Sequence, residues 1–254
     1  MKRSPQFWLA SIGIGIVLIL ILYFLCCHDS PVEGNVRTTN FDETSKTGII
    51  NTFYDNGHVA SITKFVNGKK HGLSRSYYEN GNLKASVNYD FGIRQGEARR
   101  YYESGKIYRV SQYYEGELDG IRKKFNKSGK LLAEIPYLYG YPGTGLKEYT
   151  NSKPVKKYPE LITKIGAENR ELHTKLLTVY FEGRPEKVSF FLGDLINNQF
   201  LHNHLVEIPV TDGIGSIAIP DTNHNTGMSH VNVIGKLQSK FNNPYIVQKN
   251  IKIR

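Results

Sequence analysis

The sequence predicts a mainly β protein preceded by one N-terminal apolar helix. Three observations lead to this prediction: an uncharged apolar stretch at 7–25, a glycine-centred motif that recurs every 24 residues within 49–150, and a series of short apolar runs in 155–254. A fixed period of this length is typical of stacked repeat arrays, in which each unit is one supersecondary motif. We therefore expect a membrane helix at 1–27, a stalk at 28–48, and then the repeat array and a second β domain.

The stretch from Phe7 to Leu25 is long enough to cross a membrane. It contains no charged residue. At about 1.5 Å per residue, a helix of this length nearly spans a hydrocarbon core of about 30 Å. Because Lys2 and Arg3 precede the stretch, the positive-inside rule predicts a cytoplasmic N-terminus, with the soluble region on the other side. The sequence thus predicts a single-pass membrane protein.

Two alternatives explain the same apolar stretch. A cleaved signal peptide usually has an apolar region of about 7–15 residues and ends at a small-residue cleavage site. The residues that follow here, Tyr23-Phe24-Leu25-Cys26-Cys27, offer no such site. Lipid attachment at Cys26 or Cys27 is the second alternative, although small residues normally precede a lipidated cysteine. No further cysteine follows Cys27, so disulfides cannot stabilise the soluble region.

Four sequence blocks share one pattern, in which a polar turn ends at Gly57, Gly81, Gly105 or Gly129. Asn-Gly precedes the returning strand in two of them, and this dipeptide favours a type I′ turn with positive φ at both central residues. The returning strand alternates apolar and polar residues, which indicates a half-buried strand. A second glycine column, which we interpret as the links between hairpins, comprises Gly68, Gly92, Gly116 and Gly140. We expect an antiparallel meander in which each unit contacts only its neighbours.

Two adjacent aromatic columns precede the first glycine column. Neighbouring residues on a strand point to opposite faces, so the two columns cannot share one face. In one interpretation, one column is exposed and binds a partner, because aromatic side chains supply large contact areas. In the other, both columns stabilise the sheet through cross-strand packing. The candidate binding residues are Phe53, Tyr77, Tyr101 and Phe125.

Short apolar runs separated by turn signals recur through residues 155–254. The last run, from Tyr245 to Ile253, alternates apolar and polar side chains. Six or seven such strands in about 95 residues predict an immunoglobulin-like β-sandwich.

The residues that could support chemistry do not form a recognisable site. His202 and His204 would project to one face of a strand, and further candidate metal ligands follow at Asp221, His224 and His230. Imidazole and carboxylate groups bind zinc, but this spacing does not bring them together. Ser216 lies in a glycine-rich strand rather than in the strand-turn-helix of a nucleophile elbow. We therefore expect no enzyme, no metal, no cofactor and no small-molecule substrate.

The formal net charge of +10 is spread along the chain. Its densest runs are 122–124, 69–70 and 156–157. Nucleic-acid binding normally requires a concentrated patch or stripe, so we expect no nucleic-acid partner. A solvated basic surface is the simplest interpretation, and anionic lipid or an acidic partner are the alternatives.

The motif Tyr-Tyr-Glu-Asn-Gly-x-Leu at 77–83, closed by Gly-x-x-x-Gly at 92–96, resembles the MORN-repeat variant of bacterial YwqK-type proteins. The resemblance covers about residues 50–150 and implies a MORN-type array of β-hairpins. Proteins of that group are described as antitoxins or immunity partners, and MORN repeats act as interaction scaffolds. A membrane anchor and an extra C-terminal domain depart from the group. We therefore expect a non-enzymatic, membrane-anchored scaffold that binds another protein at a bacterial cell envelope, with an antitoxin that binds a toxin as the alternative.

Overall fold

The computed structural model describes residues 35–221 and 229–253. Every regular element in these two ranges is a β-strand, and none of the described residues forms a helix able to cross a membrane. The predicted membrane helix at 1–27, with Cys26 and Cys27, lies outside the described residues, as does His224. The prediction of a mainly β, antiparallel protein is confirmed for the part that the structure describes.

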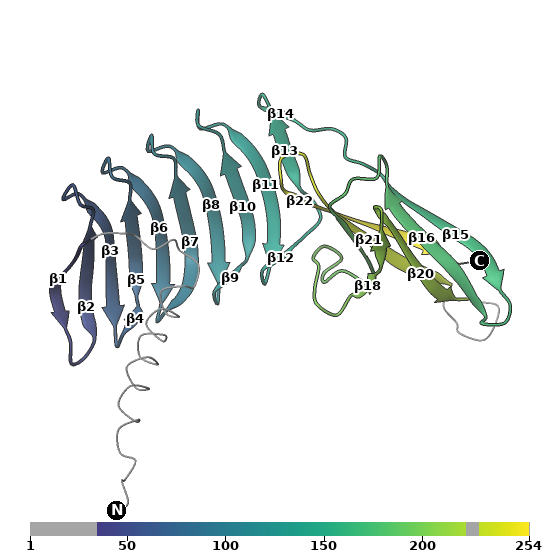
Figure 1. Ribbon diagram of the computed structural model, residues 1–254, viewed down its shortest axis with the longest axis horizontal. Helices are drawn as coiled ribbons and strands as arrows, with labels where there is room; N and C mark the ends of the chain where they lie inside the picture. The colour runs from purple at the N-terminus through teal and green to yellow at the C-terminus, as the bar shows by residue number, and fades with distance from the viewer. Residues whose placement is uncertain (1–34, 222–228, 254) are drawn as a thin grey trace, which may run out of the picture.

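The repeat region forms one open sheet of 14 strands, arranged as a single curved layer (Figure 1). Each long strand pairs antiparallel with the next one in the chain, so the sheet is a continuous meander. Four two-residue strands, β4, β9, β12 and β14, pair only with the strand before them. The strands are β1 (Asn35–Asp42), β2 (Thr47–Phe53), β3 (Val59–Val66), β4 (Lys69–Lys70), β5 (Gly72–Tyr77), β6 (Leu83–Asp90), β7 (Ile93–Tyr101), β8 (Ile107–Tyr114), β9 (Glu117–Leu118), β10 (Gly120–Phe125), β11 (Leu131–Leu138), β12 (Tyr141–Pro142), β13 (Lys147–Thr150) and β14 (Lys153–Pro154).

Strand β1 lies where we predicted part of the stalk. It pairs with β2 from Asn35 to Asp42, so these residues belong to the array. Its residues lack the alternation of apolar side chains that marks a half-buried strand. Backbone hydrogen bonds alone can hold a strand at the edge of a sheet, and every residue type can make them. The pattern of side chains therefore did not reveal this strand.

The turns of the first glycine column differ from the prediction. Tyr54 accepts a hydrogen bond from the Gly57 amide (2.9 Å) and donates one from its own amide to His58 (2.8 Å). Only Gly57 has positive φ (82°), whereas Asn56 does not. This pattern is a three-residue loop with a glycine bulge, and the strand register shifts beside it at Phe53. The type I′ prediction is therefore wrong for this column, because Asn-Gly serves both kinds of turn.

The second glycine column forms the two-residue type I′ turns instead. In each, both central residues have positive φ, as in Asn67 (50°) with Gly68 (73°) and Glu115 (49°) with Gly116 (88°). The flanking residues pair directly, for example Val66 with Lys69. The amide of each of these glycines also donates to a carbonyl of the preceding repeat, as Gly116 does to Arg94 (3.0 Å). What we interpreted as links are thus the tight turns that join one repeat to the next.

Glu115 is the less favourable choice at its turn position, so replacing it should stabilise the array. A left-handed conformation costs an ordinary residue about 1–2 kcal/mol, and asparagine adopts it more readily. We expect Glu115→Asn to raise the free energy of unfolding by about 1 kcal/mol, measured by chemical denaturation. The reciprocal variant Asn67→Glu should lower it by a similar amount. A neutral or destabilising effect of Glu115→Asn would contradict the assignment of this turn.

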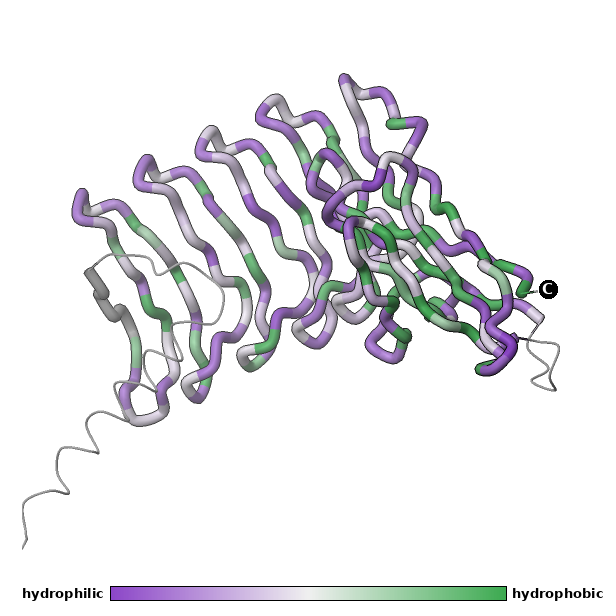
Figure 2. Tube along the Cα trace, turned by 45° about the vertical axis from the view of Figure 1, so that its right-hand side comes forward, coloured by the Kyte–Doolittle hydropathy of each residue, from purple (hydrophilic) through white to green (hydrophobic). Residues whose placement is uncertain are grey.

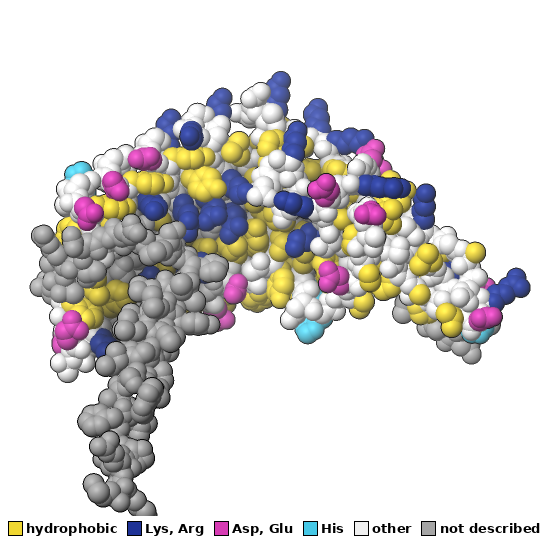
Figure 3. Space-filling view, in the orientation of Figure 1, with side chains coloured by type: hydrophobic (Ala, Val, Ile, Leu, Met, Phe, Trp, Pro, Cys, Tyr) yellow, Lys and Arg dark blue, Asp and Glu magenta, His cyan; other side chains and the backbone are white. Residues whose placement is uncertain are grey.

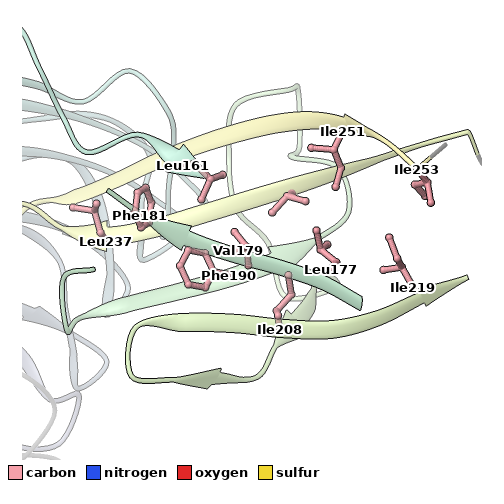
Figure 4. Close-up of a cluster of buried hydrophobic side chains, with 11 residues drawn as sticks. Leu161, Leu177, Val179, Phe181, Phe190, Ile208, Ile219, Leu237, Ile251 and Ile253 are labelled. Atoms are coloured by element: carbon pink, nitrogen blue, oxygen red, sulfur yellow. The ribbon is translucent and has the colours of Figure 1, made fainter. Parts of the chain in front are cut away.

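The C-terminal part consists of two antiparallel four-stranded sheets packed face to face (Figure 1). One contains β15 (Leu161–Asn169), β16 (Thr174–Phe181), β20 (Ile214–Pro220) and β19 (Val210–Thr211), and the other contains β18 (Val206–Ile208), β17 (Val188–Leu192), β21 (His230–Gln238) and β22 (Pro244–Lys252). Side chains of both sheets form the main core (Figure 4). Phe181 and Phe190 meet there with ring centroids 5.6 Å apart. A Cβ atom on Gly235 would lie 2.6 Å from the Phe181 ring, so only glycine permits this approach.

The sandwich covers the C-terminal end of the array. Tyr245 packs against the sandwich core and against the array cluster of Ala133, Ile135, Tyr137 and Leu146, and it stacks on Tyr158 at 4.5 Å. Figure 2 shows hydrophilic residues at the upper hairpin tips and more hydrophobic residues in the sandwich. The end of the array therefore gains a core that its middle strands lack.

A buried polar network joins the two parts. Glu148 of β13 is 1% exposed and accepts hydrogen bonds from Ser239 Oγ (2.6 Å) and Asn243 Nδ2 (2.5 Å). Lys124 of β10 donates to Asn243 Oδ1 (2.5 Å). Ser239 and Asn243 both belong to the segment between β21 and β22. The array and the sandwich are thus held together by charge-assisted hydrogen bonds as well as by packing.

The raised pKa of Tyr158 should make the free energy of unfolding decrease at alkaline pH. Burial, and then the nearby Glu148 carboxylate, raises the pKa of the Tyr158 phenol well above its ordinary range. The folded state therefore retains the phenolic proton at a pH at which the unfolded state releases it, and stability falls as pH rises above about 10. We expect thermal unfolding of Tyr158→Phe to be less sensitive to pH between about 9 and 11 than that of the unsubstituted protein. The same alkaline slope in both proteins would contradict this role.

Candidate functional site: a basic face on the repeat sheet

The strand register assigns each residue of the array to one of the two sheet faces. Residues that lie directly opposite each other on paired strands point to the same side. Arg100 of β7 pairs with Arg109 of β8, and Arg109 pairs with Lys124 of β10. These three cations therefore form a row across three adjacent strands. We call this side of the sheet the basic face and define it by Tyr89, Arg94, Arg100, Arg109, Tyr113, Arg122, Lys124 and Tyr137.

The row places like charges beside each other, which destabilises the folded sheet. Like charges directly opposite each other on paired strands are destabilising. Burial, and then the charges of Arg122 and Arg100, lower the pKa of Arg109. Burial lowers the pKa of Lys124 as well, with further contributions from Arg122 and Arg109. Arginine nevertheless stays protonated in proteins, so the face carries a concentrated positive charge.

Tyrosines hold two of the arginines in place. The Arg94 guanidinium lies 4.7 Å from the centre of the Tyr113 ring, and that of Arg122 lies 4.8 Å from the centre of the Tyr137 ring. Each arginine also reaches the hydroxyl of its tyrosine, at 3.3 and 3.4 Å. Cation–π contacts at exposed sites contribute about 0.5–1 kcal/mol each. These contacts order the side chains before any ligand arrives.

A shallow hollow lies between the arginines. Its walls are Val87, Tyr89, Arg94, Ala98, Arg100, Arg109, Ser111 and Tyr113. Ser111 is almost fully buried at its floor, and Arg122 Nε lies 3.4 Å from its hydroxyl. The small side chains of Ala98 and Ser111 leave room between the longer ones. The hollow could therefore accept a small anionic group beside several cationic donors.

Carboxylates of the same strands lie on the opposite face. The acidic residues of β7, β8, β10 and β11 are Glu97 and Glu134. Glu97 pairs with Arg99 (2.6 Å), and Glu134 lies 3.8 Å from Lys123. Glu148 lies on the basic face at the C-terminal end of the array, and its carboxylate accepts hydrogen bonds from Ser239 and Asn243. Figure 3 shows the Lys and Arg side chains gathered over the middle of the sheet.

The aromatic residues predicted to bind a partner lie at the strand ends and are half-buried: Phe53, Tyr77, Tyr101 and Phe125. The backbone carbonyls of the last three accept hydrogen bonds in a ladder between repeats, in which the hydroxyl of Tyr54 donates to Tyr77 (2.6 Å), that of Tyr78 to Tyr101 (2.7 Å) and that of Tyr102 to Phe125 (2.7 Å). Each such bond contributes about 1 kcal/mol. The column of Tyr54, Tyr78 and Tyr102 thus has a structural role, and a binding role for the four predicted residues stays a prediction.

The ladder stops at the fourth repeat. Asn126 occupies the position that the tyrosine holds in the three earlier repeats. Its side chain turns back to its own hairpin and accepts hydrogen bonds from the Ser128 and Lys130 amides, at 3.0 and 2.9 Å. The tyrosine ladder between repeats therefore ends where the sandwich begins to cover the array.

The candidate metal ligands do not converge in the described residues. His202 contacts the Asp194 carbonyl (2.8 Å), and the rings of His202 and His204 are 5.8 Å apart. Asp221 is buried and pairs with Lys175 (2.9 Å), while His230 contacts Ser229 (2.9 Å). Within 35–221 and 229–253, no group of three or more His, Cys, Asp or Glu could hold a metal ion.

Sequence reasoning missed the basic face. The run 122–124 looked like one basic cluster, but its side chains divide between the two faces, because Lys123 pairs with Glu134 and Lys124 with Ala133. Comparison of equivalent positions in the 24-residue repeats could have identified the face, because cations replace small neutral residues there in the middle repeats. Arg100 and Lys124 share a column with Ser76, and Arg109 shares one with Ala85 and Ala133.

The fold and the face together define an open-sheet repeat protein with a cationic surface. Three segments of the chain match the model of the MORN repeat variant family, at residues 70–90, 94–115 and 118–139. The chain therefore carries MORN-variant repeats in this region, which confirms that part of the resemblance. A search of curated proteins finds no match to this chain. MORN repeats commonly mediate protein or membrane interactions.

Proposed function

We propose that this chain is a non-enzymatic scaffold that binds another protein through the basic face of its repeat sheet. The observation that carries the proposal is the row formed by Arg100, Arg109 and Lys124 beside ordered tyrosines. Arginine and tyrosine are enriched among the residues that contribute most to protein interfaces. A one-layer sheet also presents this face to solvent without a covering helix among the described residues.

Site-specific photo-crosslinking in cells tests this function. Tyr113 on the basic face and Tyr108 on the other face are replaced, one at a time, by the photoreactive amino acid p-benzoylphenylalanine. Tyr108 points to the other face because it alternates with Arg109 on β8. We expect a protein adduct from position 113 and none from position 108. Adducts from neither position would overturn the proposal.

The proposal places the scaffold on a membrane at a bacterial cell envelope. The apolar stretch from Phe7 to Leu25 supports an anchor, and Cys26 and Cys27 are the residues available for lipid attachment. Alkaline carbonate extraction should leave the full chain in the membrane fraction. Release of the intact chain into the soluble fraction would overturn the anchor, and retention that is lost in Cys26→Ser/Cys27→Ser would assign it to lipid.

An antitoxin role is the second candidate. The YwqK-type motif at 77–83 favours it. Co-expression with a toxin encoded by a neighbouring gene should then restore growth, and the restoration should require the repeat sheet. Growth arrest that the chain does not relieve would exclude this role for that toxin.

The C-terminal sandwich fits the immunoglobulin-like order of strands. With β15 to β18 named A, B, C and C′ and β19 to β22 named D, E, F and G, the two sheets have the orders A-B-E-D and C′-C-F-G. Immunoglobulin-like sandwiches pair their strands in this way. An experimental structure of the full chain tests this proposal, which a different strand order would overturn.

A further inference from the structure

We infer that the outer edge of β22 is a self-association surface, and that Lys249 keeps a second copy of this chain from pairing with it. Strand β22 ends the sheet order β18-β17-β21-β22, so within the described residues only one of its two edges is paired with another strand. This inference concerns the sandwich and does not depend on the basic face or on the proposed scaffold function.

Strand β22 is long and regular, unlike the other strands that end the three sheets. It pairs with β21 over its whole length of nine residues without a register shift. The pairing of β1 and that of β15 each contain a register shift, and β14, β18 and β19 are only two or three residues long. Irregular pairing and short length both prevent edge-to-edge association of sheets, and β22 has neither.

The backbone of β22 offers hydrogen-bonding groups at its outer edge. At the two ends of the β21–β22 hairpin, amide-to-carbonyl hydrogen bonds join Ser239 to Asn243 (2.8 Å) and Ile253 to Ser229 (3.1 Å). Hydrogen-bonded pairs alternate along an antiparallel ladder, so the odd-numbered residues of β22 bond to β21. The residues whose amides and carbonyls point away from β21 are Ile246, Gln248, Asn250 and Lys252.

Lys249 interrupts the apolar side of this strand. It lies directly opposite Val233, which is fully buried in the sandwich core, so its side chain starts on the core side of the sheet. Ile251, on the same side, is buried in that core (Figure 4). Lys249 is nevertheless exposed, and its Nζ donates to the Leu161 carbonyl of β15 at 3.4 Å. The ammonium group therefore lies between the edge strands of the two sheets.

Pairing with a second copy would take this charge out of water. A two-fold interface is self-complementary, and two β22 strands that pair antiparallel about Gln248 would join two four-stranded sheets into one. Lys249 would then lie between Val233 of its own chain and Val247 of the second copy. Removing an ammonium group from water without a charged partner is strongly unfavourable. Inward-pointing charges on edge strands prevent pairing for this reason.

Replacing Lys249 with valine tests the inference. The full chain in nonionic detergent is followed by sedimentation velocity, and we expect Lys249→Val to sediment as a dimer at a concentration at which the unsubstituted protein is a monomer. Lys252→Val is the matched control, because it removes the same charge from the same strand but on the outer face, opposite His230. It should remain a monomer, as should Lys249→Arg, which keeps the charge.

A proline at position 248 distinguishes edge pairing from other kinds of association. Gln248→Pro removes an amide that points away from β21, so it leaves the ladder with β21 intact and blocks pairing at the outer edge. We expect Lys249→Val/Gln248→Pro to sediment as a monomer. A double variant that still forms the dimer would show that the added valine associates in another way, and would overturn the inference.

Thermal unfolding and the remaining outcomes complete the test. Because valine adds apolar surface beside Val233, the Tm of Lys249→Val should equal or exceed that of the unsubstituted protein. Association accompanied by a lowered Tm would assign it to partial unfolding and overturn the inference. Three further results would overturn it as well: a monomeric Lys249→Val, equal dimerisation of Lys252→Val, or an unsubstituted dimer that Gln248→Pro dissociates.

Discussion

Replacing Glu148 with alanine should separate the unfolding of the sandwich from that of the array. The carboxylate is buried and accepts hydrogen bonds from Ser239 and Asn243, which in turn accepts one from Lys124. Without it, two buried donors lose their acceptor, and the positive charge of Lys124 loses a nearby negative one. Donors left unsatisfied in a buried site cost about 1–3 kcal/mol each, so we expect Glu148→Ala to lower the free energy of unfolding by about 3 kcal/mol.

Differential scanning calorimetry measures this effect. A single heat-absorption peak for the unsubstituted protein should become two, because each part then unfolds by itself. Glu134→Ala is the matched control, since Glu134 lies on the neighbouring strand and contacts only residues of the array, Lys123 at 3.8 Å and the Tyr149 hydroxyl at 3.1 Å. These contacts do not join the array to the sandwich, so this variant should retain one peak. One peak and a loss below about 1 kcal/mol for Glu148→Ala would show that packing alone joins the two parts.

Phe181→Ala should have the largest effect within the sandwich. Phe181 is fully buried, lies 5.6 Å from Phe190 and contacts the backbone position of Gly235. Removing a buried phenylalanine leaves a cavity and costs about 3–5 kcal/mol. We expect this loss by chemical denaturation of the full chain. Phe241→Ala removes a ring that is 41% exposed and should change stability by less than about 0.5 kcal/mol.

Equal effects of the two phenylalanine variants would contradict the assignment of the sandwich core. A loss confined to a second, sandwich-specific transition would support it and would also show that the array can remain folded alone. The two predictions are therefore linked. Combining Glu148→Ala with Phe181→Ala should destabilise the sandwich transition without further change in the transition of the array.

The repeat array could be predicted in considerable detail. The glycine columns and the alternation of the returning strands act over a few residues, and the antiparallel sheet follows from them. The kinds of turn could not be assigned in the same way, because Asn-Gly suits both a type I′ turn and a glycine bulge. The choice depends on how many residues lie between the last paired positions, such as Thr52 and Ser61, and these pairs are set by the whole sheet.

Strand β1 and the basic face illustrate two further limits of sequence reasoning. Strand β1 lacks alternating apolar residues, so its sequence pattern resembled that of a linker, although it pairs with β2. Arg100, Arg109 and Lys124 occupy three separate strands, and their charges look dispersed in the sequence. They become neighbours only when the bulges and turns between β7 and β10 set the register.

The sequence by itself determined the 24-residue repeat, the hairpins within it and the β character of both parts, because turn chemistry and side-chain periodicity are local properties. Only the tertiary structure decided which cations meet and how Glu148 comes to be buried. Glu148 and Asn243 are far apart in the chain and meet because the segment between β21 and β22 folds back onto β13. Such contacts depend on strand register and on the packing of distant segments, and no local pattern contains that information.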